Sequence, residues 1–125
     1  MTLMHRPVAI AMLLSLALLA LYLAFPTKVY YWDGIVFAQA IEDAAGGSNL
    51  SLAHPNHLIY NVVGYVFYEL LRVFNADLRA ITALQILNSI LSAASATILF
   101  LILRDTFRST YFAVCLTLLF ALSAT

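Results

Sequence analysis

The sequence contains few charged residues, since Asp, Glu, Lys and Arg make up only 10% of its 125 positions. Soluble domains carry about 25% charged residues, so this composition excludes an ordinary soluble globule. The six basic residues are balanced by six acidic ones, which excludes the basic surface needed to bind nucleic acid. The single cysteine, Cys115, excludes a disulfide framework and a site built from several thiolates. With only four Gly and three Pro, the chain is not of low complexity.

Hydrophobic residues are abundant instead, at 64% of the chain, and the mean hydropathy is +0.96. This composition predicts an all-α integral membrane protein that forms a single membrane domain over residues 1–125. A span needs about 20 apolar residues, and the apolar runs predict about four transmembrane helices, at about 7–25, 55–74, 79–103 and 109–125. Residues 26–54 then form the first external loop.

The first apolar run follows Arg6 and is longer than the apolar part of a signal peptide. We therefore interpret it as a retained signal anchor with its N-terminus in the cytoplasm. Lys and Arg are equally divided between the two predicted sides, so charge bias does not settle the orientation. The chain ends at Thr125 inside an apolar stretch, without the Pro, Gly or charge that usually ends a helix. We expect the sequence to be the N-terminal part of a larger polytopic protein.

Small and polar residues recur every three or four positions along the third predicted span, at Thr82, Gln85, Asn88, Ser89, Ser92 and Ser95. This spacing places them on one face of a helix. Such a stripe is typical of a seam between membrane helices, and Ser89/Ala93 and Ser92/Ala96 have small-xxx-small spacing. A polar pore lining is the alternative interpretation.

The external loop opens with Tyr31 and Trp32, which fit an aromatic belt at the membrane interface. Stacking on a sugar or a lipid headgroup is the alternative role for these two rings. Asp33 follows directly and precedes a helical stretch over 34–45, for which it is suited as the N-cap. Capping and catalysis both stay open as the role of Asp33.

The stretch 34–45 predicts a short amphipathic helix on the membrane surface, with apolar residues on one face and Gln39, Glu42 and Asp43 on another. We interpret Glu42 and Asp43 as part of a solvated face. The Gly46-Gly47 pair is typical of a helix C-terminus. Further along the chain, Glu69 and Arg72 have the i, i+3 spacing of an ion pair.

Two histidines, His54 and His57, flank Pro55 at the start of the second predicted span. Proline fits the first turn of a helix, so both histidines lie at the positive end of the helix dipole, where an anion such as phosphate binds. Because the loop leaves and re-enters the membrane at one interface, we expect Asp33 to lie near both. Asp33 would act as general base, while the histidines and the helix end hold a lipid phosphate.

This order of features resembles the GT-C superfamily of polytopic membrane glycosyltransferases, and within it the protein mannosyltransferase, aminoarabinose transferase and RgtA-B-C-D-like branch. The resemblance lies in segments 25–42 and 52–61, which contain Trp32-Asp33-Gly34 and His54-Pro55-Asn56-His57. Many relatives carry two adjacent acids where this chain has Asp33 followed by Gly34. Relatives also have roughly eight or more spans, twice what this chain can hold.

The resemblance implies an inverting transfer of a sugar from a polyprenyl-phosphate donor to a lipid, glycan or protein acceptor, with Asp33 as the base. His54, His57, Trp32 and Tyr31 would bind the substrate. It implies no organic cofactor and leaves the need for a divalent cation open. It also implies a multi-pass protein of the bacterial inner membrane, in contact with membrane lipid and completed by further C-terminal or partner helices. The fragment alone would be inactive.

Two other functions stay open. The first is a small non-enzymatic membrane subunit whose polar stripe on the third span binds partner helices. The second is a metal-handling membrane protein that uses His54, His57 and Asp33, because His-x-x-His spacing suits zinc once a third ligand is supplied.

Overall fold

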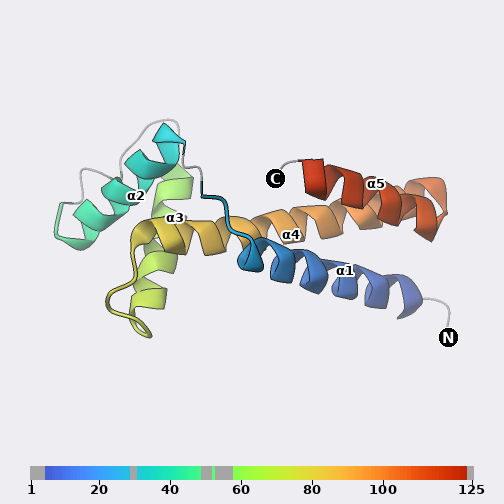
Figure 1. Cartoon of the computed structure of the whole chain (residues 1–125), viewed down its shortest axis with the longest axis horizontal. Coiled ribbons are helices and arrows are strands. Elements are labelled where there is room, and N and C mark those ends of the chain that lie inside the picture. The colour runs from blue at the N-terminus through green and yellow to red at the C-terminus, as the bar shows by residue number, and fades with distance from the viewer. Residues whose placement is uncertain (1–4, 29–30, 49–51, 53–57, 124–125) are drawn as a thin grey trace. The chain divides into compact units, whose positions relative to one another are not determined.

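The computed structural model describes residues 5–28, 31–48, 52 and 58–123. These residues form five α-helices, which are α1 His5–Ala24, α2 Trp32–Ala45, α3 Leu58–Arg72, α4 Ala80–Phe107 and α5 Thr110–Ser123 (Figure 1). The expected all-helical fold is therefore confirmed. A helix lies in each of the four apolar runs and in the stretch that was predicted to form an amphipathic helix.

Among the described helices, two are long and apolar enough to cross a bilayer by length and composition, namely α1 over Pro7–Ala24 and α4 over Ala80–Phe107. The helix α3 has 15 residues and α5 has 14. At a rise of about 1.5 Å per residue, each covers only about 20 Å of a hydrocarbon core that is about 30 Å thick. The spans predicted at 55–74 and 109–125 therefore stay predictions.

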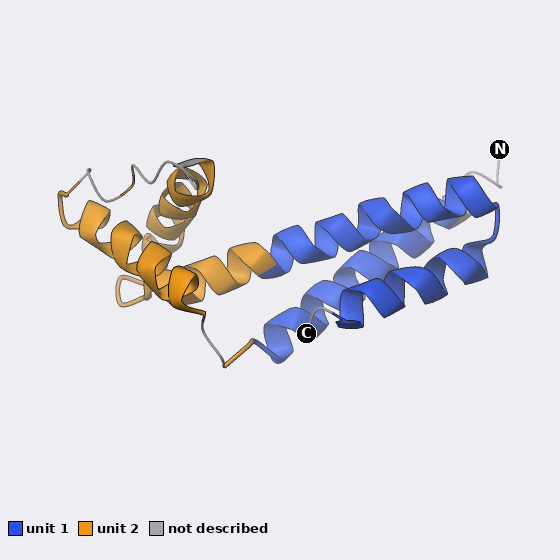
Figure 2. Ribbon diagram, turned by 90° about the horizontal axis from the view of Figure 1, so that it is seen from above, with its two compact units in different colours: residues 1–26, 89–125 blue, residues 27–88 orange. Residues whose placement is uncertain are grey.

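The chain divides into two compact units, of which unit 1 comprises residues 1–26 and 89–125 and unit 2 comprises residues 27–88 (Figure 2). The helix α4 contributes its first turns to unit 2 and its longer remainder to unit 1.

Unit 1 is a three-helix layer in which α1 lies antiparallel to α4. One cluster joins Ala11 of α1 to Phe100 of α4 and Ala113 of α5. A second cluster joins Leu18 of α1 to Ala93 and Ala96 of α4 and to Ala121 of α5. Residue numbers rise from the first cluster to the second on α1 and α5 and fall on α4. The helices α1 and α5 are therefore parallel to each other and antiparallel to α4, as Figure 2 also shows.

The seam of α4 in unit 1 consists of alanines and one phenylalanine. Ala93, Ala96 and Phe100 are buried, whereas Ser92 and Ser95 are exposed. The prediction that small residues line a seam is therefore confirmed for the alanines of the two small-xxx-small pairs. Ser92 and Ser95 lie outside this seam, because the helix turns their side chains away from α1 and α5 and buries the adjacent face.

Unit 2 packs α2, α3 and the first turns of α4 around one apolar cluster. Its fully buried members are Ile41 of α2 and Ala80 and Ala83 of α4. The helices approach one another closely at Gly64 of α3, where an added Cβ would lie 2.8 Å from Leu84 Cδ2 and 2.9 Å from Ile41 Cδ1. Only a residue without a side chain fits this position without movement of its neighbours.

The helices α2 and α3 run in the same direction. The rings of Phe37 and Tyr60 meet edge to face with their centroids 5.7 Å apart. One turn further along both helices, Ile41 lies against Gly64. The order of contacts is the same on the two helices, so α2 and α3 begin at the same end of their shared interface.

Candidate functional site

The first turn of α2 holds the predicted catalytic residue. The N-cap is Tyr31, whose backbone is extended and whose side chain makes no capping hydrogen bond, and Asp33 lies in the first turn. The prediction that Asp33 is the N-cap is therefore wrong by two positions, because Trp32 already has helical geometry. An acid in the first turn still interacts favourably with the positive end of the helix dipole. The carboxylate of Asp33 is exposed.

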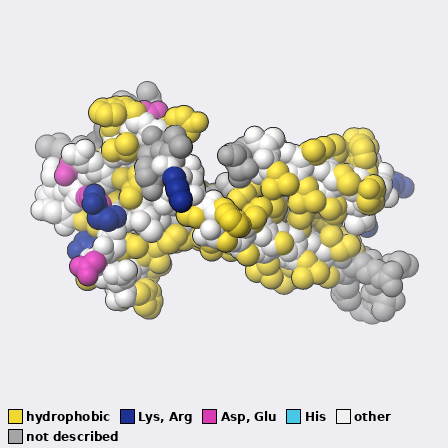
Figure 3. All heavy atoms as spheres, in the orientation of Figure 1, with side chains coloured by type: hydrophobic (Ala, Val, Ile, Leu, Met, Phe, Trp, Pro, Cys, Tyr) yellow, Lys and Arg dark blue, Asp and Glu magenta, His cyan; other side chains and the backbone are white. Residues whose placement is uncertain are grey.

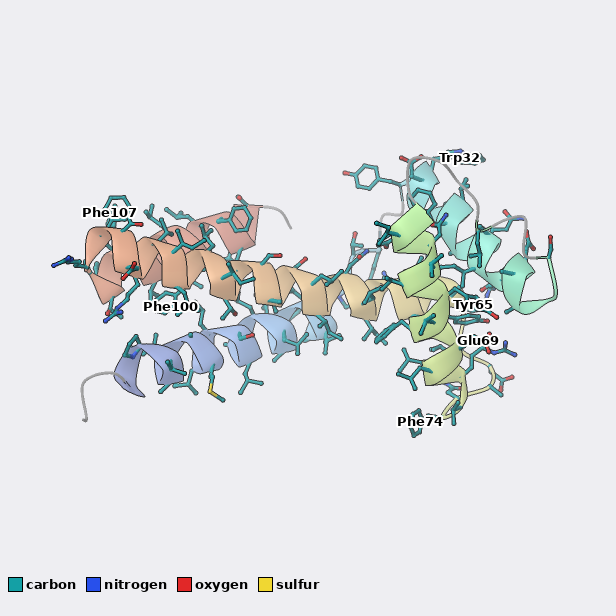
Figure 4. All side chains as sticks on the ribbon, turned by 180° about the vertical axis from the view of Figure 1, so that it is seen from behind. Trp32, Tyr65, Glu69, Phe74, Phe100 and Phe107 are labelled. Carbon is teal, nitrogen blue, oxygen red and sulfur yellow. The ribbon has the colours of Figure 1, made fainter. Side chains whose placement is uncertain are left out.

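The two aromatic residues before Asp33 are also exposed, Tyr31 to 83% and Trp32 to 77%. Trp32 projects from the starting end of α2 (Figure 4). Large aromatic side chains with this much free surface are available to a ligand or to a membrane interface.

The predicted partners of Asp33, His54 and His57, lie outside the described residues, and the description resumes at Leu58 at the start of α3. The expectation that Asp33 and the two histidines meet therefore stays a prediction. Among the described residues, no three His, Cys, Asp or Glu side chains gather closely enough to hold a metal ion.

The described residues of unit 2 contain a surface depression of about 440 Å³ between α2 and the start of α4. Its lining combines both signs of charge with apolar side chains, from Ile35, Ala38, Gln39, Glu42, Asp43, Arg79 and Ile81. The lining begins at Ile35, two positions after Asp33, so Asp33 and this depression lie on the same helix.

Glu42 forms the main polar contact of the depression. Its Oε1 accepts hydrogen bonds from Arg79 Nε at 2.7 Å and from the backbone N–H of Ala80 at 3.0 Å, and its Oε2 accepts one from Arg79 Nη2 at 3.1 Å. The side chain is 28% exposed. The interpretation of Glu42 as part of a solvated face is wrong, because the packing of α2 brings this carboxylate to the N-terminus of α4. Asp43 is exposed, as expected.

These contacts shift the ionisation of both groups. The hydrogen bond from Arg79 holds the pKa of the Glu42 carboxyl below its ordinary value of 4.5, against an opposing effect of partial burial, and the Ala80 N–H adds to the lowering. The same hydrogen bond and the charge of Glu42 raise the pKa of Arg79. Glu42 therefore stays ionised below the pH at which a free glutamate is protonated.

Asn61 of α3 is a buried polar residue that is not among the predicted site residues. Its side chain is fully buried, and neither amide atom has a hydrogen-bond partner among the described residues. It lies one turn before Gly64, on the face of α3 that packs against α2 and α4. A polar residue in an apolar run indicates a helix that does not face lipid on every side, but the packing of three helices decides which side is buried.

The ion pair expected between Glu69 and Arg72 is confirmed, with Glu69 Oε1 accepting a hydrogen bond from Arg72 Nη1 at 3.1 Å. The guanidinium of Arg72 also lies over the ring of Tyr68, 5.4 Å from its centroid. Glu69 projects from the last turns of α3 (Figure 4). The pair is a local feature of α3.

Comparison of the chain with protein-family models, with curated protein sequences and with solved structures finds no match.

Proposed function

We propose that this protein is an integral membrane glycosyltransferase of the GT-C type, in which Asp33 is the general base. The observation that carries this proposal is the position of Asp33. Its carboxylate is exposed in the first turn of α2, in a segment that joins two helices, α1 and α4, long and apolar enough to cross a bilayer.

The surface of unit 1 supports a membrane location. Only 17% of the apolar window in α1 and 22% of that in α4 is buried, whereas the core helix of a soluble protein is mostly buried. Large apolar side chains such as Met12, Leu16, Ile98 and Leu119 are exposed on all three helices, and hydrophobic side chains cover most of the visible face of this unit (Figure 3). Soluble monomers rarely expose continuous apolar surface of this kind.

The charges support the same placement. Lys28, Asp33, Glu42, Asp43, Glu69, Arg72, Asp77 and Arg79 all belong to unit 2. The charged residues described in unit 1 are Arg6 in the first turn of α1 and Arg104, Asp105 and Arg108 at or just after the end of α4. The stretch 7–24 of α1 and the stretch 80–103 of α4 contain none. We place these stretches in the bilayer, the bacterial inner membrane, because ionised side chains are costly there.

The chemistry at Asp33 is a proton transfer coupled to substitution. The carboxylate takes the proton of the acceptor hydroxyl, and the hydroxyl oxygen forms a bond to the anomeric carbon of the sugar. The bond from that carbon to the lipid phosphate breaks with inversion, and the polyprenyl phosphate leaves as an anion. The rings of Tyr31 and Trp32 offer apolar faces on which a sugar can stack. His54 and His57 are the proposed partners of the phosphate.

Two measurements test the proposal. The protein should stay in the membrane fraction after extraction with alkaline carbonate. In membranes that contain the protein, transfer of labelled sugar from polyprenyl-phosphate mannose or polyprenyl-phosphate aminoarabinose should fall about 10²–10⁴-fold in Asp33→Asn, the usual contribution of a general base. Asp43→Asn, an exposed acid at the other end of α2, is the matched control and should keep normal turnover. Normal turnover by Asp33→Asn would contradict the assignment.

A non-enzymatic membrane subunit is the second candidate. It is favoured by the exposure of Ser92 and Ser95, which leaves part of the polar stripe of α4 available to a helix of another protein. On this alternative, Ser92→Leu would release a partner protein from the purified complex, and Asp33→Asn would have no effect.

A further inference from the structure

A hydrogen bond between two uncharged side chains links α3 to α4 at the surface of unit 2. The hydroxyl of Tyr60 donates to Asn88 Oδ1 at 3.2 Å, and the bond is exposed. Asn88 is the last residue of unit 2, and its side chain makes no other hydrogen bond with the described residues. Neither residue has a role in the mechanism proposed above.

The pair offers hydrogen-bond donors and an acceptor side by side. Because Asn88 accepts through Oδ1, its amide keeps both N–H groups of Nδ2 for another partner. The phenolic oxygen of Tyr60 keeps its capacity to accept. Both side chains are uncharged, which suits a ligand without charge, whereas a phosphate is bound best by a cation. A sugar ring has the complementary chemistry, because each of its hydroxyl groups both donates and accepts.

Asn88 is an exposed polar side chain on an apolar helix. The helix α4 is long and apolar enough to cross a bilayer, and its stretch 80–103 contains no charged residue. A carboxamide without a polar partner is costly in apolar surroundings, and polar side chains in such segments commonly mark a substrate site. Asn88 therefore needs a polar neighbour, and within the described part of the chain only Tyr60 supplies one.

Phe37 connects this pair to Asp33. The rings of Phe37 and Tyr60 meet edge to face, with their centroids 5.7 Å apart. Asp33 lies four positions before Phe37 on α2, so the two residues are neighbours on one helix face, with their Cβ atoms about 5–6 Å apart. The helices α2 and α3 begin at the same end of their interface. Side chains on a helix lean toward its start, so Phe37 and Tyr60 both lean toward the turn that holds Asp33.

The same turn of α2 has free space on its inner face. Gly34 precedes Ala38 by four positions and Ile41 by seven, so it lies on the face of α2 that is buried further along the helix. A Cβ added to Gly34 would meet none of the described atoms within 4 Å. The start of α2 therefore leaves room for a ligand directly beside Asp33.

We propose that Tyr60 and Asn88 bind hydroxyl groups of the sugar that the enzyme transfers. This inference rests on the glycosyltransferase function proposed above and assigns two further residues to the donor sugar. The sugar must lie next to the base, because its anomeric carbon forms the bond to the oxygen that Asp33 deprotonates. The contacts from Asp33 through Phe37 to Tyr60 and Asn88 then follow the sugar away from that carbon, with the aromatic rings against its apolar face.

The sugar dependence of binding tests the proposal. Trp32 is the single tryptophan of the chain and is exposed beside Asp33, so its fluorescence reports a ligand at this turn. The purified protein in detergent micelles is titrated with polyprenyl-phosphate mannose, with polyprenyl-phosphate aminoarabinose and with polyprenyl phosphate that carries no sugar. The native protein should bind at least one sugar donor more tightly than the lipid without sugar. Equal affinity for all three would overturn the proposal.

Two variants locate the sugar contact. Asn88→Ala and Tyr60→Phe should each weaken binding of the preferred sugar donor about three- to tenfold, the usual effect of a lost neutral hydrogen bond, and leave binding of polyprenyl phosphate unchanged. Tyr60→Phe keeps the ring that contacts Phe37, and Asn88 is exposed, so both variants retain the packing. Thr82→Ala removes another exposed polar side chain from the first turns of α4 and is the matched control, with native affinities expected.

Native affinity for the sugar donor in either variant would overturn the proposal. An equal loss of affinity for the sugar donor and for polyprenyl phosphate would assign the pair a structural role and would also overturn it.

The titration contains no acceptor, so it does not depend on the base, and the two proposals fail separately. A sugar-dependent loss of affinity in Asn88→Ala, together with normal turnover by Asp33→Asn, would keep the sugar contact and reject the base. An inactive Asp33→Asn variant with native sugar affinity in Asn88→Ala would do the reverse.

Discussion

Glu42 on α2 caps the N-terminus of α4, because its Oε1 accepts a hydrogen bond from the N–H of Ala80 at 3.0 Å and a second one from Arg79 Nε at 2.7 Å. The first N–H groups of a helix have no partner within it, and Ala80 is fully buried. A carboxylate from another helix therefore satisfies a group that α4 cannot satisfy itself. The contact fixes α2, and with it Asp33, to the start of α4.

Replacement of Glu42 by Ala should destabilise the first turn of α4 by about 1 kcal/mol, the usual loss for a removed helix cap. Amide hydrogen exchange in detergent micelles should then be about fivefold faster at Ala80, Ile81 and Thr82. Asp43→Ala is the matched control, because this neighbouring acid is exposed. Unchanged exchange in Glu42→Ala would show that the cap does not contribute to stability.

The same contact predicts a dependence on pH. The folded state holds the pKa of Glu42 below its ordinary value of 4.5, chiefly through the hydrogen bond with Arg79. A lowered carboxyl pKa stabilises the fold above pH 4.5, and this contribution is lost as the pH falls through the folded value. The protection of the Ala80 amide, measured relative to the intrinsic exchange rate at each pH, should therefore fall on acidification below pH 4.5 in the native protein and much less in Glu42→Gln. An equal loss of protection in both proteins would refute this origin.

The two helical glycines Gly64 and Gly34 should respond in opposite ways to alanine. At Gly64 the new Cβ would lie 2.8 Å from Leu84 Cδ2 and 2.9 Å from Ile41 Cδ1, and overpacking of this kind costs about 1–3 kcal/mol. At Gly34 nothing lies within 4 Å of the added atom, so the gain in helix propensity, up to about 1 kcal/mol, remains. Thermal unfolding followed by circular dichroism should show a lower midpoint for Gly64→Ala and an equal or higher one for Gly34→Ala. The reverse order would contradict the close packing of α3.

Thr117 and Thr97 form a second pair with opposite expectations. Thr117 Oγ1 is buried without a hydrogen-bond partner in the described structure, and such a group costs about 1–3 kcal/mol. Thr97 Oγ1 donates to the carbonyl of Ala93 at 2.8 Å. Thr117→Val, which keeps the shape, should raise the midpoint of thermal unfolding, whereas Thr97→Val should leave it unchanged or lower it. A lower midpoint for Thr117→Val would indicate that its hydroxyl has a partner.

Local features of the sequence predicted the C-terminal end of α2 correctly but misplaced its start. The Gly46-Gly47 terminus is confirmed. Gly47 has φ +105°, and the N–H groups of Gly47 and Ser48 bond to the carbonyls of Ala44 and Asp43, the pattern of a helix end that favours glycine. The start was misplaced, because several adjacent residues can begin a helix and the sequence does not rank them.

Contacts between residues that are far apart in the sequence could not be predicted from local sequence patterns. Glu69 and Arg72 were predicted to pair because i, i+3 residues are neighbours on any helix. Glu42 and Arg79 are 37 positions apart, and neither residue indicates the other. The sequence also does not indicate which face of α3 is exposed, because apolar residues occur on both of its faces.

By itself the sequence determined the helical fold, the approximate extent of α1 and α4 and the end of α2. These follow from runs of apolar residues and from glycines, whose effects extend over one or two turns. The tertiary structure alone decided that α1 and α4 are antiparallel, that Glu42 caps α4 and that Asn61 is buried. Each of these depends on which helix faces come together, and that choice is made by the fit of side chains such as Ile41 and Leu84 around Gly64.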